Sequence, residues 1–173
     1  YKCQKYKMGD IKKQKKKFSK PGHPWQKHRI AAERELLKLY GLRRKYDVWK
    51  MDSMLKKFLH RAKTIIGKKT LQMEIEKNQL LNKLYVLGLL KKDAKIEDIL
   101  NLTLKDILNR RLQTLVYKKN LARSTLQARQ LITHEHISVN NRKIINPSYI
   151  VSIQEEQNIK LMLPITLQNN SNA

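Results

Sequence analysis

The sequence predicts an α+β protein in which a helical N-terminal domain precedes a unit of two helices packed on a small antiparallel sheet. Three observations lead to this prediction. Apolar residues recur every three or four positions through most of the chain up to Ile132, as on one face of a helix. From Ile137 the apolar period switches to two, as in a half-buried strand. Glycine follows three of the expected helices, where it favours a helix end.

Three helices are predicted in the N-terminal domain. The first covers 24–40 and opens near Pro24, whose fixed φ angle suits a first helical turn. The second begins near its expected cap Asp47 and ends at Gly67, and the third covers 71–87. The residues predicted to face the core are Ile30, Leu36, Leu37 and Tyr40, then Val48, Met51, Leu55, Phe58, Ala62 and Ile65, then Ile75, Leu80, Leu81, Leu84 and Leu87.

A short helix near 96–100 leads to a longer one. The strings Ile-Glu-Asp-Ile-Leu at 96–100 and Leu-Lys-Asp-Ile-Leu at 104–108 are interpreted as two amphipathic helix starts, because two copies this short do not define a repeat. The longer helix starts at Thr103, which can form a capping box with Asp106. Its apolar face consists of Leu104, Ile107, Leu108, Leu112, Leu115 and Val116. Its other face carries Arg110, Arg111, Lys118 and Lys119, which suit either solvent or phosphates.

The next predicted helix begins at Ser124, which can form a capping box with Gln127. Its buried stripe consists of Ala128, Leu131 and Ile132. The unpaired amides and the positive dipole end of a helix N-terminus suit a phosphate. Arg123 precedes this N-terminus, and Arg129 and Gln130 lie one to two turns into the helix. Arginines on both sides of a helix start favour phosphate binding over a plain solvent surface.

Short strands are predicted after this helix. Ile137 and Val139 alternate with polar residues, and the Asn-Asn pair at 140–141 can adopt the positive φ angles of a tight hairpin before Ile144 resumes the apolar run. Alternation returns at 149–153, a turn is expected at 155–158, and Ile159, Leu161 and Leu163 form a last strand.

This part of the chain resembles the RNA-binding domain named after small-subunit ribosomal protein four, the S-four domain. The family pattern places A-R-x-L-I before G-x-I-x-V-N-G and P-S-x-x-V. The matches are Ala-Arg-Gln-Leu-Ile at 128–132, His-Ile at 136–137, Val-Asn at 139–140 and Pro-Ser at 147–148. The chain departs from the pattern at Glu135 and Asn141, where glycine is usual.

The resemblance extends to the archaeal and eukaryotic branch of this ribosomal protein family over residues 8–163. The further matches are His-Pro-Trp at 23–25, Tyr-Gly-Leu-Arg at 40–43, Val-Trp at 48–49, Leu-Tyr-Val-Leu-Gly-Leu-Leu at 84–90 and Arg-Arg-Leu-Gln-Thr at 110–114. Within this alignment Met8 is interpreted as the start, and residues 1–7 as an upstream extension.

The resemblance implies a structural constituent of the small ribosomal subunit. Such a protein binds small-subunit ribosomal RNA directly, helps nucleate assembly near the mRNA entrance side, and has neighbouring ribosomal proteins as its other partners. Two alternatives stay open. One is a free S-four-type binder, such as a stress or chaperone protein on RNA or a nucleoid protein on DNA. The other is the RNA-binding module of an RNA-modifying enzyme, although the chain leaves no residues for a catalytic domain.

Composition agrees with a polyanionic partner. The chain carries 38 Lys and Arg against 14 Asp and Glu, a net charge of +24, which is unusual for an enzyme of small metabolites. Aromatic residues make up only 6% of the chain, which favours reading folded RNA by shape and phosphate over stacking on many unpaired bases. Because Cys3 is the single cysteine, neither an internal disulfide nor a multi-cysteine zinc site is expected.

The positive charge is concentrated at the N-terminus. Residues 1–70 hold 23 Lys and Arg against 5 Asp and Glu, a net of +18, and the rest of the chain carries the remaining +6. A tract as basic as 2–20 cannot bury enough apolar surface to fold alone. It is either a solubilising tail or an arm that orders against phosphates, and we favour the arm.

No catalytic or metal site is expected. His134 and His136 flank Glu135, but side chains at a helix-to-strand junction need not converge and no further ligand cluster lies nearby. Glycine-rich phosphate loops, nucleophile elbows and paired-carboxylate sites are not found, so neither a cofactor nor a small-molecule substrate is expected. No apolar run approaches the length of a membrane span and the N-terminus lacks a signal-peptide core, so we expect a cytoplasmic, ribosomal location.

These expectations define an organisation and a set of RNA contacts. The expected parts are a basic arm at 1–22, a helical RNA-binding domain at 23–102, an S-four-type domain at 103–163 and a polar tail at 164–173. The expected contacts are Lys12, Lys13, Lys15, Lys16, Lys17, Lys20, Lys50, Lys57, Arg61, Arg110, Arg111, Lys118, Arg123, Ser124, Arg129 and Gln130.

Overall fold

The computed structural model describes residues 16–68 and 70–162. Its helices are α1 (Lys27–Tyr40), α2 (Lys45–Gly67), α3 (Leu71–Val86), the 3-10 helix η1 (Ile96–Asn101), α4 (Leu104–Asn109), α5 (Leu112–Lys118), α6 (Thr125–Thr133) and α7 (Ile153–Glu156). Its strands are β1 (Ile137–Val139), β2 (Arg142–Lys143) and β3 (Ile159–Leu161). The expectations for Cys3, Lys12, Lys13 and Lys15, for strand residue Leu163 and for the tail lie outside these residues.

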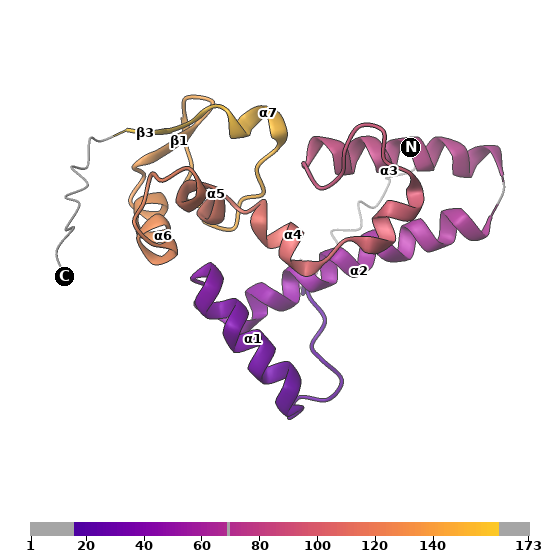
Figure 1. The fold of residues 1–173 in the computed structure, drawn as a ribbon, viewed down its shortest axis with the longest axis horizontal. Helices are drawn as coiled ribbons and strands as arrows, with labels where there is room; N and C mark the ends of the chain where they lie inside the picture. Colours follow the sequence, from indigo (N-terminus) through magenta and orange to yellow (C-terminus); the bar gives the residue numbers. More distant parts are fainter. Residues whose placement is uncertain (1–15, 69, 163–173) are drawn as a thin grey trace, which may run out of the picture.

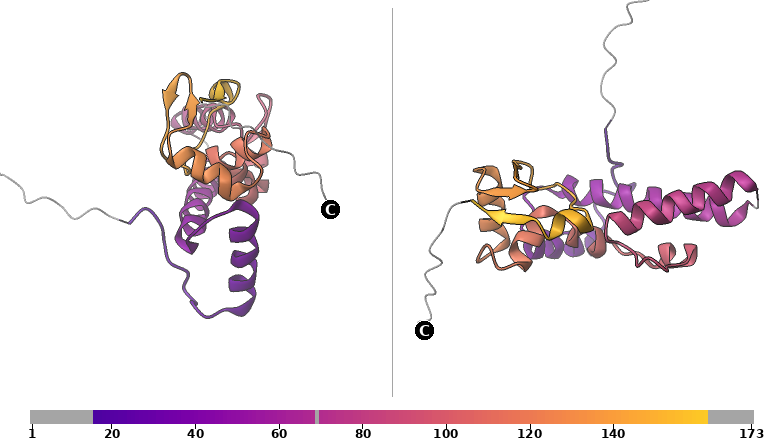
Figure 2. Two further views of the ribbon diagram at one scale, coloured as in Figure 1. Left: turned by 90° about the vertical axis from the view of Figure 1, so that its left-hand side faces the viewer. Right: turned by 90° about the horizontal axis from the view of Figure 1, so that it is seen from above.

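The molecule has a helical part and a mixed part at its two ends. α2 and α3 form a long antiparallel pair, the sheet with α5 and α6 lies at the opposite end, and α4 lies between them (Figure 1). Seen from above, the C-terminal end of α2 and the N-terminal end of α3 lie farthest from the sheet (Figure 2). The predicted fold class, helices followed by two helices on a small antiparallel sheet, is confirmed.

The apolar face of α2 is confirmed in full. All six residues predicted to face the core are buried: Val48, Met51, Leu55, Phe58, Ala62 and Ile65. The helix begins two residues before Asp47, so Asp47 lies in the first turn and Arg44 takes the predicted cap position. Ile75 of α3 is also not where the sequence predicted it, because it is exposed on the side opposite Leu80 and Leu84.

Gly41 ends α1 in the left-handed conformation, with φ 60°. The amide of Leu42 donates to the carbonyl of Leu37 at 3.0 Å, which closes the last turn. A Cβ atom on Gly41 would lie 2.6 Å from Thr125 Oγ1 and 2.9 Å from Gln113 Nε2. Both the φ angle and the close approach of the C-terminal part therefore require glycine at this position.

The long helix predicted from Thr103 is in fact two helices, α4 and α5. Arg111 has extended backbone angles, φ −71° and ψ 140°, and separates them. The break is stabilised from a distant segment, because the amide of Leu112 donates to Tyr149 O at 2.8 Å and the amide of Val151 donates to Arg110 O at 3.0 Å. The apolar spacing did not reveal the break because residues on both sides of it are buried.

The sheet has three antiparallel strands in the order β2-β1-β3. Val139 of the central strand pairs with Arg142 on one side and Ile159 on the other. Asn140 and Asn141 have φ angles of 50° and 62°, which confirms the predicted hairpin.

The strand predicted at 149–153 does not join this sheet. Within it, Ile150 forms one isolated bridge with Arg111. The expected turn then contains α7, because Ser152 and Glu155 form a capping box in which the Ser152 amide donates to Glu155 Oε2 at 2.9 Å. Local helix capping therefore replaces the alternating pattern.

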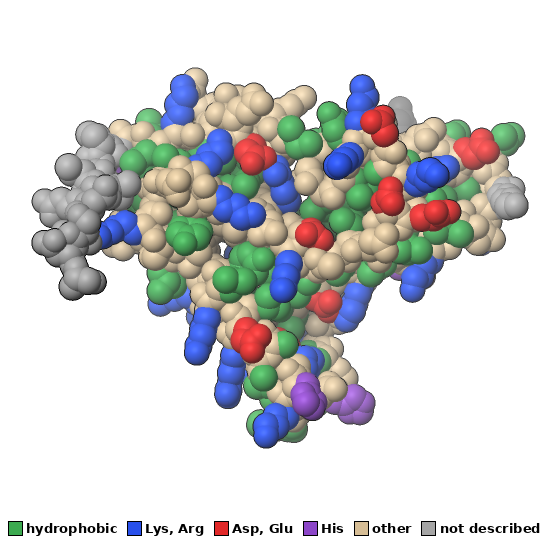
Figure 3. Space-filling model, in the orientation of Figure 1, with side chains coloured by type: hydrophobic (Ala, Val, Ile, Leu, Met, Phe, Trp, Pro, Cys, Tyr) green, Lys and Arg blue, Asp and Glu red, His purple; other side chains and the backbone are tan. Residues whose placement is uncertain are grey.

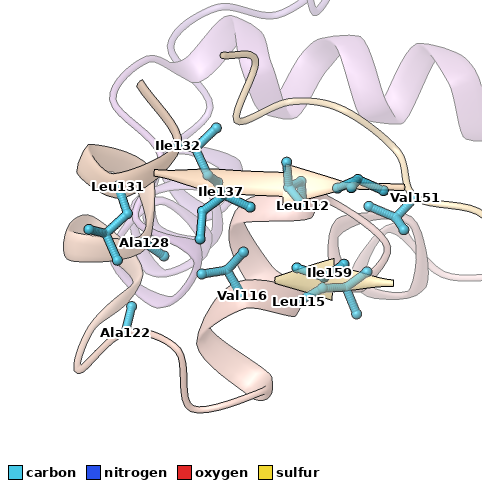
Figure 4. Close-up of a cluster of buried hydrophobic side chains, with 11 residues drawn as sticks. Leu112, Leu115, Val116, Ala122, Ala128, Leu131, Ile132, Ile137, Val151 and Ile159 are labelled. Atoms are coloured by element: carbon cyan, nitrogen blue, oxygen red, sulfur yellow. The ribbon is translucent and has the colours of Figure 1, made fainter. Parts of the chain in front are cut away.

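Three apolar cores hold the fold together. In the mixed part, side chains from α5, α6 and the sheet converge, including Val116, Ile132, Ile137 and Ile159 (Figure 4). A second core joins α1 and α2 to Ile107 and Leu108 of α4, and a third joins α2, α3 and η1. α4 thus buries its apolar side against the helical part, although it precedes α5 directly in the chain.

Candidate nucleic-acid interface

The first turn of α6 is exposed and positively charged. Arg123 and Ser124 both face solvent. Ser124 Oγ accepts a hydrogen bond from the amide of Gln127 at 3.1 Å, as predicted. Gln127 Oε1, however, accepts from the amide of Arg123 at 2.7 Å instead of from Ser124, so the cap encloses one more residue than expected. The remaining amides at this helix start and the Arg123 side chain can bind an anion together.

Arg129 and Gln130 lie one to two turns further along α6. Arg129 is half-buried, and its Nη1 has no hydrogen-bond partner among the described residues. Gln130 is exposed and lines a hollow of about 350 Å³ with Gln127, Leu131, His134 and His136. We call Arg123, Ser124, Arg129 and Gln130 the α6 patch.

Arg110 does not lie on the predicted basic surface. Its side chain is only 13% exposed, Nη1 pairs with Glu156 Oε2 at 2.7 Å, and Nη2 donates to Val151 O at 3.0 Å. These contacts bind the break between α4 and α5 to the segment that carries α7. The helical pattern failed here because the break turns Arg110 toward the interior.

Arg111 is buried outright, with 1% of the residue exposed, which also corrects its placement on the basic face. Burial lowers the pKa of its guanidinium, nearby Asp47 acts in the opposite direction, and Arg129 lowers the pKa further. Its Nε and Nη1 have no hydrogen-bond partner among residues 16–68 and 70–162. A side chain so enclosed supports the fold and cannot meet an RNA phosphate directly.

Gln113 connects the two parts and was not predicted. It is buried, and its Nε2 donates to Tyr40 O at 3.2 Å, to Gly41 O at 3.0 Å and to Thr125 O at 2.8 Å. The end of α1 is thereby held against the start of α6. The available signal was a glutamine between Leu112 and the apolar pair Leu115 and Val116, because buried amides need hydrogen-bond partners.

Residues 16–20 lie against α2. Phe18 stacks on Tyr46 with ring centroids 5.9 Å apart, and the amide of Ser19 donates to Ser53 Oγ at 3.1 Å. These contacts anchor the segment beside a row of cations. The resulting groove of about 440 Å³ is lined by Lys16, Lys17, Phe18, Ser19, Ser53, Lys56, Lys57 and His60.

The structure brings the lysines of this segment together with those of α2. Lys17, Lys50 and Lys57 line a hollow of about 160 Å³ with Ser148 and Ile150 of the mixed part. We call Lys16, Lys17, Lys50 and Lys57 the α2 patch. Arg61 is not part of it, because Arg61 lines another groove with α3, and Lys20 and Lys118 are exposed elsewhere.

The junction after α6 shows why glycine is usual at position 135 in the family pattern. Glu135 has a φ angle of 64°, a conformation that glycine adopts without strain. The rings of His134 and His136 stack with centroids 6.3 Å apart. Over the described ranges, no group of three or more His, Cys, Asp or Glu side chains is placed to hold a metal ion. A membrane-crossing helix is likewise not found in the part of the chain that the structure describes.

Comparisons with known proteins give two results. The S4 domain family, which is the S-four domain of the sequence resemblance, matches residues 110–156. Proteins named small ribosomal subunit protein uS4 from Saccharolobus islandicus (strain L.S.2.15 / Lassen #1) and Saccharolobus solfataricus are 50% identical to the chain over 150 residues, covering 86% of this chain and 83% of theirs. The protein of the same name from Ignicoccus hospitalis is 47% identical over 150 residues, covering 87% of this chain and 90% of its own.

Proposed function

The chain belongs to the uS4 family of small ribosomal subunit proteins, and from this premise we propose that it binds small-subunit ribosomal RNA directly and helps nucleate assembly of the subunit. As a family member it is a structural, non-enzymatic protein of the cytoplasmic ribosome. Neighbouring proteins of the particle are its other partners. The sequence motifs shared with the family support a position near the mRNA entrance side.

The proposed mechanism is a rigid two-part clamp on folded RNA. The α2 patch and the α6 patch offer cations on the two parts, and the buried Gln113 fixes the parts relative to each other. Phosphate contacts supply affinity, and the fixed spacing selects RNA of matching shape. We propose that the boundaries at 23–102 and 103–163 separate these two parts, with α4 packed across the boundary.

The proposal also includes the other predicted RNA contacts. We propose that the arm extends the α2 patch along the RNA, and that Lys20, Arg61 and Lys118 add phosphate contacts beside the patches. Arg110 and Arg111 instead stabilise the break between α4 and α5. The added residues of the arm are Lys12, Lys13 and Lys15.

The exposed, charged start of α6 carries the proposal, and its removal tests it. We expect Arg123→Ala with Arg129→Ala to weaken binding to a folded ribosomal RNA fragment by about 1–3 kcal/mol, because charge-assisted contacts to phosphates are lost. The salt dependence of the affinity should fall by roughly one phosphate contact for each arginine removed. Filter binding in a salt series measures both quantities.

Lys77→Ala with Lys92→Ala is the matched control, because it removes two exposed cations that lie outside both patches and outside the groove of Arg61. The control should bind as the wild type does, and both variants should keep the thermal midpoint. Equal affinity of the wild type for duplex DNA and folded ribosomal RNA would contradict recognition by shape.

Sedimentation separates the ribosomal role from a free RNA-binding role. A tagged chain should migrate with small subunits at moderate salt and dissociate only as the salt concentration rises. A chain that binds RNA but stays at the top of the gradient would support the free binder. Turnover of RNA or of an amino acid by the purified chain would support the enzyme module.

A further inference from the structure

α3 has a second apolar face that the fold does not use. Leu80 and Leu84 face the core and are buried. On the opposite side Leu71 is 82% exposed, Ile75 55% and Val86 50%. With 100° per residue, these three positions fall on one stripe along the helix axis. We call this the α3 stripe.

The α3 stripe has no positive charge. Asn78 and Asn82 complete the stripe between its apolar residues, and both are exposed. Glu74 borders the stripe beside Leu71 and Lys83 borders it beside Val86, whereas Lys77 lies farther round the helix. A surface of apolar groups and neutral amides, bordered by one carboxylate and one ammonium group, lacks the clustered cations that bind an RNA backbone.

The surroundings of the stripe are also neutral. Residues 71–106 hold six Asp and Glu and six Lys and Arg, a net charge of zero in a chain of net charge +24. The space-filling view shows carboxylates interspersed with Lys and Arg side chains over the end of the molecule that holds α3 (Figure 3). The cationic patches and this face therefore suit different partners.

We infer that the α3 stripe is a docking surface for an apolar segment of a neighbouring small-subunit protein, with a basic side chain at one edge of that segment and an acidic one at the other; this inference rests on the proposed function. The partner's apolar side chains cover Leu71, Ile75 and Val86 and exclude water from them. A basic residue of the partner faces Glu74 on one border and an acidic residue faces Lys83 on the other, which gives charge complementarity at the rim. The asparagine amides between the apolar residues can bond to the partner's backbone.

Cysteine labelling tests whether the stripe is covered. Asn82→Cys is introduced together with Cys3→Ser, so that the chain carries one thiol. We expect a maleimide to label the free chain and to lose this reaction in purified small subunits. Unchanged labelling in the subunit would overturn the inference.

A photo-crosslink identifies what covers it. Gln79→Cys, at the edge of the stripe and again with Cys3→Ser, is labelled with a benzophenone maleimide before the chain is incorporated into small subunits. We expect irradiation to join the chain to a second ribosomal protein, through a peptide rich in apolar residues. A crosslink to ribosomal RNA, sensitive to nuclease, would overturn the inference.

Leu71→Gln with Ile75→Gln removes the apolar contact in this crosslinking background. Both side chains are exposed and glutamine is a good helix former, so the fold should not change. We expect the protein crosslink to be lost while the chain still enters the subunit through its RNA contacts. Leu39→Gln with Ile145→Gln, which removes exposed apolar side chains elsewhere, should keep the crosslink.

The outcomes distinguish the two proposals. A chain that does not enter small subunits fails the proposed function, and the docking inference fails with it. A chain that enters normally but whose crosslink survives the α3 substitutions fails the docking inference alone.

Discussion

Two pairs of arginines that look alike in the sequence have opposite environments in the structure. Arg110 and Arg111 are enclosed at the break between α4 and α5, whereas Arg123 is exposed at the start of α6 and Arg129 is half-buried behind it. The difference arises from partners more than 30 residues away in the chain, since Val151 and Glu156 take up the donors of Arg110. A cluster of basic residues therefore predicts phosphate binding only where the fold leaves the guanidinium groups accessible.

Substitution of single arginines gives the sharpest contrast between the pairs. We expect Arg111→Ala to lower the free energy of unfolding by about 2–4 kcal/mol, because it opens a cavity and leaves Asp47 without its nearby cation. Arg111→Met should cost less, because it fills the space without a charge. Urea unfolding measures both changes.

Arg123→Ala is the matched control and should change the free energy of unfolding by less than about 0.5 kcal/mol, as is usual at exposed sites. Equal losses for Arg111→Ala and Arg123→Ala would remove the distinction between a structural and a binding pair.

The residue between the two pairs gives the next largest effect. Gln113→Ala leaves three backbone carbonyls without their donor, and we expect it to destabilise the protein by about 1–3 kcal/mol. RNA binding should weaken as well, since the start of α6 is no longer held against α1. Gln130→Ala, which changes an exposed glutamine in the same part, should leave unfolding in urea unchanged. A similar loss of stability for Gln130→Ala would argue against the link that Gln113 forms between α1 and α6.

A smaller effect on stability is expected at Ser124, beside the exposed Arg123. Ser124→Ala removes the cap of α6 and should cost about 1 kcal/mol in urea unfolding, whereas Ser124→Gly should cost only a few tenths. If alanine and glycine were equal, the hydroxyl would not be the cap that the structure indicates.

The pH dependence of the unfolding free energy tests the segment at 149–156, which contacts the enclosed Arg110 and Arg111. Its Tyr149 Oη donates to Glu155 Oε1 at 2.7 Å, and this hydrogen bond, with burial adding to it, raises the pKa of Tyr149 to about 12. Burial would raise the pKa of Glu155, but the hydrogen bonds from Tyr149 and Ser152 lower it.

The stability supplied by Tyr149 is therefore present below pH 10 and lost as the pH rises through about 12. The stability supplied by Glu155 is present above pH 4.5 and lost as the pH falls through its lowered pKa. The difference in unfolding free energy between the wild type and Tyr149→Phe should thus be constant near neutral pH and shrink at both extremes. A difference that does not vary with pH would contradict this account.

Local rules were sufficient where a residue's neighbours in the chain determine its conformation. The buried face of α2, the end of α1 at Gly41 and the hairpin at Asn140 follow from periodicity and from tolerance of positive φ. The same rules missed the break at Arg111, whose hydrogen bonds come from residues 147–151, and α7, where the Ser152 cap prevails over alternation. Within the α6 patch, sequence reasoning found the accessible Arg123, but it could not separate it from the buried Arg111.

The packing of α4 against α1 and α2 sets the order in which the cores of a nascent chain can be completed. Tyr40, Leu42 and Met51 leave the ribosome first, and their core stays incomplete until Ile107 and Leu108 follow. The break between α4 and α5 is stabilised later still, when the amide of Val151 can donate to Arg110 O. For much of its synthesis the polycationic N-terminal region is therefore present without the contacts that fix its position in the fold. Until the last third of the chain has emerged, this region can bind polyanions nonspecifically.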